Sequence, residues 1–172
     1  MIYAMRSATY DTDILEWSEQ QASALRNLAR TRHDLSNELD WENVAEEIEC
    51  VGRSEFAAVR SYIRQIMIHL IKAVSAPQTE LILHWHKEVR GFHSELIDRV
   101  TPSMIARLDI ASLWRRAIKD AEVDLGEHGQ AVTPALRREC PLTAAEIADP
   151  DFDFLHAVEK IRAQIGRDTS SI

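Results

Sequence analysis

The sequence predicts an all-α fold, an antiparallel helical bundle of four main helices with additional short C-terminal helices. Apolar residues recur at intervals of three and four through most of the chain, which is the period of an amphipathic helix. Proline, glycine and capping residues interrupt this pattern at the places where helices would begin and end. No run of useful length alternates apolar and polar residues as a half-buried strand does, so we expect no sheet.

The length of the chain indicates one domain. A chain of 172 residues can bury about two-thirds of its unfolded surface without a disulfide or a structural metal. We expect a flexible N-terminus at residues 1–10, a helical bundle domain at 11–154, and a C-terminal helical extension and tail at 155–172.

Charge and composition exclude several classes of function. The formal net charge of -8 argues against a broadly basic surface for nucleic acids or membranes. No apolar run approaches the ~20 residues that a membrane-spanning helix needs. Cys50 and Cys140 lie far apart without the spacing of a metal or redox motif, which is typical of free thiols in a reducing cytoplasm. We therefore expect a cytoplasmic protein with neither a membrane nor a nucleic acid as its partner.

The first predicted helix begins after Asp11 or Thr12, either of which can serve as its N-cap. Arg30 and Arg32 near its end complement the negative end of the helix dipole. The side expected to face the core carries residues at helical spacing: Ile14, Trp17, Gln21, Leu25 and Leu28.

The stretch from Leu39 to Ser75 predicts the longest helix. Asp40 is its expected N-cap, so the helix begins near Trp41. Two apolar runs, one before Gly52 and one after it, lie nearly in phase on a helical wheel. This favours a single helix of about 50 Å that passes through Gly52. The alternative is a break at Gly52, with Ser54 as the cap of a second helix.

Downstream signals predict the remaining helices. Pro77 ends the central helix, because the residue before a proline resists the helical region, and a helix follows at about 78–99. Thr101 and Pro102 have the cap and first-position pattern of the next helix. Each of the four main helices carries one tryptophan on its apolar face, which suggests that four faces meet in one core: Trp17, Trp41, Trp85 and Trp114.

The C-terminal part has shorter signals. Thr143 and Glu146 have the spacing of a capping box, and Pro150 ends that short helix. The last segment, at 152–165, is weakly amphipathic and is expected to pack on the bundle or on a second copy through Leu155, Val158, Ile161 and Ile165.

Glu47, Glu55 and His69 on the central helix are the candidate catalytic residues and the candidate metal ligands. A helical wheel places Glu55 on the apolar face, Glu47 at its boundary, and His69 at its edge, where an imidazole can be hydrated and oriented. Two carboxylates and an imidazole can bind a divalent metal or transfer a proton. The favoured alternative is structural: the glutamates form salt bridges with Arg53, Arg60 or a neighbouring helix, and His69 caps the core edge.

A second cluster lies on the helix expected at 78–99. His84 and Glu88 share a face at four-residue spacing, which is compatible with chelation. His86 and His93 lie on a different and more exposed side. Because four ligands of one metal must converge, the pattern favours a hydrated helix face over a metal site.

Three segments carry a family resemblance: LDWENVAEEIECVGRSE at 39–55, IHLIKA at 68–73 and ECPLTAAEIADPDF at 139–152. In their order and spacing they resemble the signature blocks of the bacterial "domain of unknown function 29" family, over about residues 10–154. The resemblance implies an all-helical fold and no established activity.

These observations favour a cytoplasmic bacterial protein-interaction or regulatory module, which presents a charged groove to a partner protein or to itself. The alternative is a metal-assisted hydrolase or nuclease that uses Glu47, Glu55 and His69, with a divalent metal as its cofactor.

Overall fold

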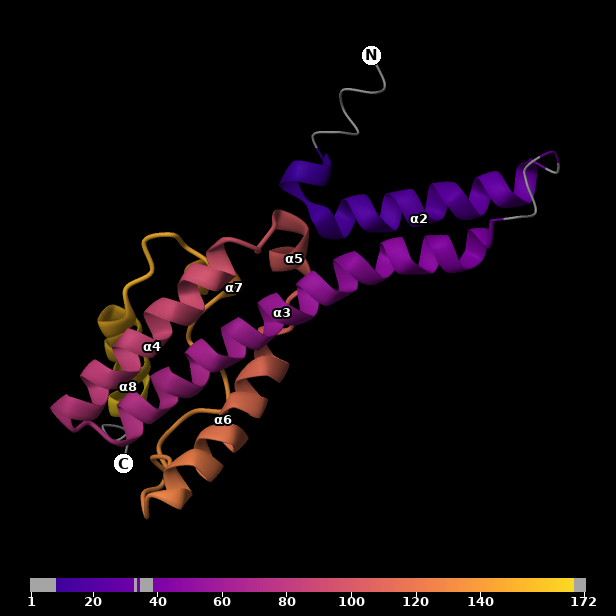
Figure 1. Cartoon of the computed structure of the whole chain (residues 1–172). Helices are drawn as coiled ribbons and strands as arrows, with labels where there is room; N and C mark the ends of the chain where they lie inside the picture. The colour runs from indigo at the N-terminus through magenta and orange to yellow at the C-terminus, as the bar shows by residue number, and fades with distance from the viewer. Residues whose placement is uncertain (1–8, 33, 35–38, 169–172) are drawn as a thin grey trace. The chain divides into compact units, whose positions relative to one another are not determined.

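A computed structural model describes residues 9–32, 34 and 39–168 of the chain. The all-α prediction is confirmed, since these residues form helices and no strand (Figure 1). Residues 1–8 of the N-terminus that we expected to be flexible lie outside the described residues. After a helical turn at 9–12, the helices in chain order are α2 (Ile14–Thr31), α3 (Trp41–Ser75), α4 (Thr79–Ile97), α5 (Pro102–Arg107), α6 (Ile110–Glu127), α7 (Ala144–Ile147) and α8 (Phe154–Asp168).

The described residues form two compact units. The first contains the chain up to Val59 together with Arg99–Arg107, and the second contains Arg60–Asp98 and the chain from Leu108 onward. Helix α3 contributes its first half to one unit and its second half to the other. None of the described helices combines the length and the apolarity that a membrane-spanning segment needs.

Helix α3 is continuous over 35 residues, which confirms the favoured single helix through Gly52; the alternative break does not occur. It begins at Trp41, as expected, and the Asn43 amide donates to the Asp40 carboxylate at 3.2 Å. This bond satisfies one of the free amides of the first helical turn. The helix ends at Ser75, two residues before Pro77.

Helix α2 is capped by Asp13, whereas the sequence predicted Asp11 or Thr12. The Asp13 carboxylate accepts from the amide of Glu16 at 3.1 Å. The sequence alone does not distinguish the three candidate caps, because each has a short side chain with an oxygen atom and all three directly precede the helix.

Tertiary contacts of Asp13 explain why it is the cap. Thr101 donates to its carboxylate at 3.0 Å, and Ser103 donates through its amide at 3.0 Å and its hydroxyl at 2.7 Å. Burial raises the pKa of Asp13, but the hydrogen bonds from Ser103, Glu16 and Thr101 hold that pKa below its ordinary value. The cap of α2 is therefore fixed by the segment that leads into α5.

Small residues line the seam between α2 and the first half of α3, which run side by side (Figure 1). Ser18 and Ala22 of α2 and Ala45 of α3 are fully buried. A Cβ atom at Gly52 would lie 2.1 Å from the Ser18 Oγ and 3.1 Å from the Leu15 Cα. The two helices therefore approach too closely for a side chain at position 52.

This seam overturns the predicted core side of the first helix. Ile14, Trp17, Gln21 and Leu25 are only half-buried, and Leu28 is 36 % exposed. The wheel favoured the largest apolar residues, whereas the buried residues of α2 are Leu15 and the small residues Ser18 and Ala22. The larger side chains consequently lie to one side of the seam.

The second unit has a conventional core of large apolar side chains. Lys72 of α3 and Asp124 of α6 form an ion pair at 3.0 Å that joins two of its helices at the surface. The buried residues from α3, α4, α6 and α8 include Ile63, Ile66, Met67, Leu70, Trp85, Val89, Leu96, Trp114, Ala117, Ala121, Phe154, Val158 and Ile161.

The prediction that four tryptophans meet in one core is wrong. Trp85 and Trp114 are buried in the second unit, whereas Trp17 and Trp41 are half-buried in the first. A helical wheel shows that a residue lies on an apolar face, but it does not show which faces pack together.

The segment after Thr101 forms two helices. Helix α5 begins at Pro102 as predicted but ends at Arg107. The Asp109 carboxylate accepts from the Ser112 amide at 2.9 Å and caps a new helix, α6. Asp109 lies inside a continuous amphipathic sequence, but its side chain can cap a helix. The chain therefore ends one helix before it and begins the next one after it.

The C-terminal elements follow the prediction with one exception. The capping box of Thr143 and Glu146 is confirmed at the start of α7. Helix α8 packs against α4 and buries Val158 and Ile161 as expected. Leu155, which we expected on the packed face, is 52 % exposed, because Phe154 occupies the buried position instead.

We expect Gly52→Ala to lower the free energy of unfolding by about 1–3 kcal/mol, because the added methyl group overpacks the seam. Gly91→Ala is the matched control, since a Cβ there has nothing within 4 Å. Replacing that helical glycine should stabilise the protein by about 0.5–1 kcal/mol. Urea unfolding followed by circular dichroism measures both, and equal stability of the two variants would contradict the close approach at Gly52.

The capping box also predicts a pH dependence. The ion pair with Lys160 and hydrogen bonds from Thr143 lower the pKa of Glu146 from 4.5 to about 2. A carboxylate with a lower pKa in the folded state stabilises it above the unfolded value and loses this effect as pH falls. The stability difference between wild type and Glu146→Gln should therefore shrink between pH 4.5 and about 2. Glu122→Gln, at an exposed position on α6, is the control, and a difference that is constant with pH would refute the prediction.

Candidate functional site

The structure gives the three predicted site residues different surroundings. The Arg99 guanidinium donates to half-buried Glu55 at 3.3 Å, so this glutamate has a salt bridge, as the structural alternative predicted, but its partner comes from the connection between α4 and α5. His69 contacts Glu88 of α4, and Glu47 is exposed without a hydrogen-bond or ion-pair partner among the described residues. Along α3, the fourteen positions from Glu55 to His69 amount to about four helical turns.

His69 is buried, whereas the wheel predicted a hydrated edge position. It is 5 % exposed because α4 covers this side of α3, and the ring of Phe92 lies 5.5 Å from its imidazole between centroids. The Nδ1 atom lies 2.7 Å from the Gln65 carbonyl oxygen, and the Nε2 atom lies 2.6 Å from Glu88 Oε2.

These two contacts determine where protons must lie. A carbonyl oxygen can only accept, so the Nδ1 atom of His69 carries a hydrogen and donates it to Gln65. A second proton must then lie between Nε2 and the Glu88 carboxylate, on one atom or the other. The pair is a part-buried hydrogen bond that joins α3 to α4.

His84 extends this pair towards solvent. Its Nε2 atom lies 3.5 Å from Glu88 Oε1, in agreement with the predicted four-residue spacing on α4. Within the described ranges, however, no group of three or more His, Cys, Asp or Glu side chains is arranged to hold a metal ion. Metal binding or catalysis by Glu47, Glu55 and His69 stays a prediction.

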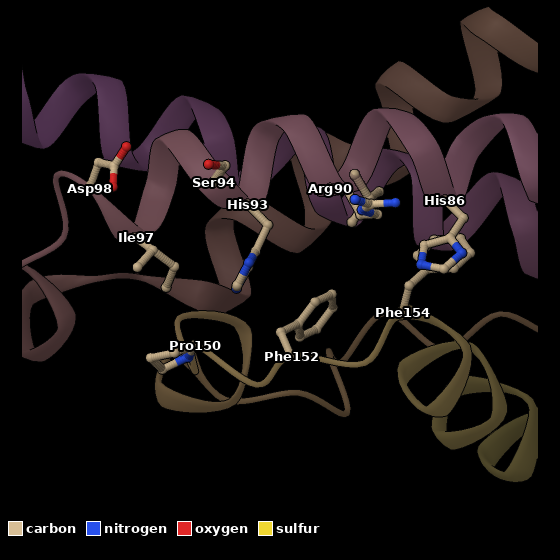
Figure 2. A pocket seen from close by; sticks show the side chains of 10 residues that line it. His86, Arg90, His93, Ser94, Ile97, Asp98, Pro150, Phe152 and Phe154 are labelled. Carbon is tan, nitrogen blue, oxygen red and sulfur yellow. The ribbon is translucent and has the colours of Figure 1, made fainter.

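A groove lies on the other side of α4, between this helix and the segment at 150–154 (Figure 2). It encloses about 460 Å³. The spacing of three and four places one face of α4 along it: His86, Val89, Arg90, His93, Ser94, Ile97 and Asp98. The groove is thus distinct from the face that carries His84 and Glu88.

Aromatic residues form the opposite wall of the groove. His86 stacks on Phe154 with ring centroids 5.2 Å apart and planes within 7° of parallel. His93 stacks on Phe152 at 5.2 Å and 23°. Two histidines of α4 are therefore oriented by two phenylalanines from a segment about 60 residues further along the chain.

Local hydrogen bonds hold this segment in place. The Asp149 carboxylate accepts from the Asp151 amide at 2.9 Å and closes a turn after α7. Asp153 accepts from the amides of Leu155 and His156 at 2.8 and 3.0 Å, which caps α8. The His156 amide is the main cause that lowers the pKa of Asp153, so this cap is ionised at neutral pH.

The groove contains a cation and an unsatisfied polar atom. Arg90 is exposed in it and has no carboxylate partner among the described residues. The buried Nε2 atom of His93 likewise lacks a hydrogen-bond partner within the described part of the chain. The exposed guanidinium can be satisfied by a carboxylate, which accepts paired hydrogen bonds from it. Asp98 lies at the far end of the same face.

Sequence reasoning did not identify this groove. It correctly placed His86 and His93 on a face apart from His84, but it expected that face to be the more exposed one. Both are half-buried against phenylalanines, whereas the His84 side chain is 60 % exposed. Sequence reasoning also did not single out Arg90 or the two phenylalanines. The three-to-four spacing of His86, Arg90 and His93 was an available signal for Arg90. No signal within the sequence paired α4 with the turn that carries Phe152.

We expect Glu88→Ala to lower the free energy of unfolding by about 1–3 kcal/mol, because it leaves the Nε2 atom of buried His69 unpaired. Glu88→Gln should cost less, since its amide can donate to a neutral imidazole. Glu122→Ala at an exposed position of α6 is the control. Urea unfolding measures all three, and a Glu88→Ala variant as stable as the control would contradict the structural role of this pair.

Comparisons with known proteins agree with this fold. A family model described as "Domain of unknown function DUF29" matches residues 9–153. A crystal structure of an alpha-helical protein of unknown function from Rhodospirillum rubrum ATCC 11170 is 42 % identical, with a TM-score of 0.85. The match covers 89 % of this chain and 97 % of that one. No protein with a curated description matches the chain. Over nearly all of its helical part, the chain thus belongs to the family described as Domain of unknown function DUF29.

Proposed function

We propose that the protein is a cytoplasmic interaction module, which binds a segment of a partner protein in the groove beside α4. The segment carries an aspartate or glutamate next to an apolar side chain. The observation that carries this proposal is Arg90, a cation that faces the groove without a carboxylate partner among the described residues. The partner's carboxylate would pair with this guanidinium.

The chemistry of the groove supports a carboxylate ligand. A guanidinium presents planar, paired donors that match the two oxygens of a carboxylate, and hydrogen bonds between charged groups are stronger than neutral ones.

The shape of the groove supports an extended segment. From His86 to Ile97 the α4 face extends about 16 Å, which an extended chain of about five residues can span. Ile97 and Phe152, both half-buried, provide apolar surface for a neighbouring side chain of the ligand.

The net charge of the protein affects the strength of this interaction. With a net charge of -8, the protein repels acidic partners at long range. Salt screens most of this repulsion beyond the Debye length, which is about 8 Å at physiological ionic strength. Binding therefore depends on short-range contact with Arg90. A regulatory role fits a weak and reversible interaction of this kind.

Peptide binding tests the proposal. The probes are labelled peptides of about five residues in which an aspartate or glutamate stands next to a leucine or phenylalanine. Fluorescence anisotropy measures their affinity for the protein. We expect the acidic peptides to bind, and Arg90→Gln to weaken binding by about 10- to 100-fold, as the loss of about 1.5–3 kcal/mol from a charged hydrogen bond predicts. Peptides in which asparagine or glutamine replaces the acidic residue should bind the wild type more weakly by a similar factor.

Arg116→Gln is the matched control, because Arg116 is an exposed arginine on α6 outside the groove. Equal effects of the Arg90 and Arg116 substitutions would indicate non-specific attraction and contradict the proposed site. The alternative function, metal-assisted hydrolysis at Glu47, Glu55 and His69, instead predicts a divalent metal in protein purified without chelator. Elemental analysis separates the two hypotheses.

A further inference from the structure

The hairpin of α2 and the first half of α3 has an exposed apolar side. We define this apolar side by five residues: Leu25, Leu28, Val44, Ile48 and Val51. Val44 is 40 % exposed and Val51 is 47 % exposed, and the end of α2 contributes Leu28 at 36 %. Exposed large apolar residues that gather on one side of an element mark interaction surfaces more often than scattered ones do.

The seam of the hairpin explains why these side chains are available. Ser18 and Gly52 bring the helices so close together that a side chain at position 52 would not fit, and Leu25 and Leu28 lie beside this close approach. The antiparallel register that places Ser18 beside Gly52 places Leu28 at the level of Glu42 and Leu25 at the level of Ala45, each within one helical turn of Val44 and Ile48. The apolar side thus spans both helices as one continuous layer.

The opposite side of the hairpin is charged and already paired. Arg26 of α2 donates to Glu42 at 2.8 Å and to Glu49 at 2.9 Å, and it also reaches Glu46 at 3.3 Å. Arg53 pairs with Glu46 as well. Because the charges on that side already have partners, covering the apolar side is the change that would lower the free energy of the protein most.

We propose that a second copy of this chain covers the apolar side, so that two hairpins form a four-helix bundle around a two-fold axis. A two-fold contact requires a surface that is complementary to itself, and an apolar two-helix layer meets this requirement. Glu55, at the border of the layer, is paired with Arg99, so the contact buries no unpaired charge from that position.

The area is sufficient for a dimer. Helix α2 has 18 residues and is about 27 Å long, and two packed helices are about 20 Å wide. One face is therefore about 540 Å², and two copies would together bury about 1,100 Å², which clears the minimum of about 1,000 Å² for a biological interface and lies just below the range of about 1,200–2,000 Å² for stable ones, as in a weak dimer.

Light scattering coupled to size-exclusion chromatography of the full chain, between about 1 and 100 µM, tests this proposal. We expect the wild type to reach twice the monomer mass of 19.6 kDa. Val51→Lys should raise the dimer dissociation constant at least about tenfold, because it places a charge in the apolar contact. The new lysine lies four residues from both Glu47 and Glu55, so it supports the helix locally.

Leu28→Lys is a second disrupting variant, from the other helix of the layer. Val123→Lys on α6 is the control, because Val123 is 63 % exposed and lies outside the hairpin. Circular dichroism checks that each variant is folded. A wild type that stays monomeric at 100 µM overturns the proposal and leaves the apolar side to a different partner. Equal effects of the Val51 and Val123 variants overturn it too, since association then uses another surface.

Discussion

The size of the residues along α3 determines what each half of this helix can pack against. In its first half, Ala45 and Gly52 let α2 approach so closely that a side chain at position 52 would overlap Ser18. In its second half, Ile63 and Met67 are large and keep their neighbours at an ordinary packing distance. One uninterrupted helix thus supports a tight two-helix hairpin and a core of several helices.

Helix α4 shows how one amphipathic helix can serve three purposes. One face is apolar and buried through Trp85, Val89 and Leu96. Another face carries Glu88, and its hydrogen bond to buried His69 fixes α4 on α3. The remaining face lines the groove. Because the helix is anchored on two sides, its groove residues are held on a rigid element, which suits a binding site.

The fold was predictable from sequence where a local rule decides the outcome. The continuity of α3 followed from the phase of its apolar runs, and the capping box of α7 from the spacing of Thr143 and Glu146. The choice of Asp13 as a cap was not predictable, because the deciding partners, Thr101 and Ser103, come from about 90 residues further along the chain.

The candidate site was predictable only in part, for the same physical reason. A wheel for α3 showed that Glu55 needs a partner, but the partner, Arg99, comes from the connection between α4 and α5. It placed His69 at an edge because a single helix does not reveal which neighbour covers it. The groove beside α4 depends on a turn capped by Asp149 and Asp153, so its aromatic wall exists only after tertiary folding.

The stacking of His86 on Phe154 and of His93 on Phe152 has a thermodynamic consequence for α8. Both phenylalanines belong to the chain that leads into this helix, and Phe154 is its first residue. A molecule held between the two walls of the groove therefore also fastens the C-terminal helix to its neighbour. The coupling is reciprocal: the free energy by which the bound molecule stabilises the packing of α8 equals the free energy by which that packing strengthens binding of the molecule.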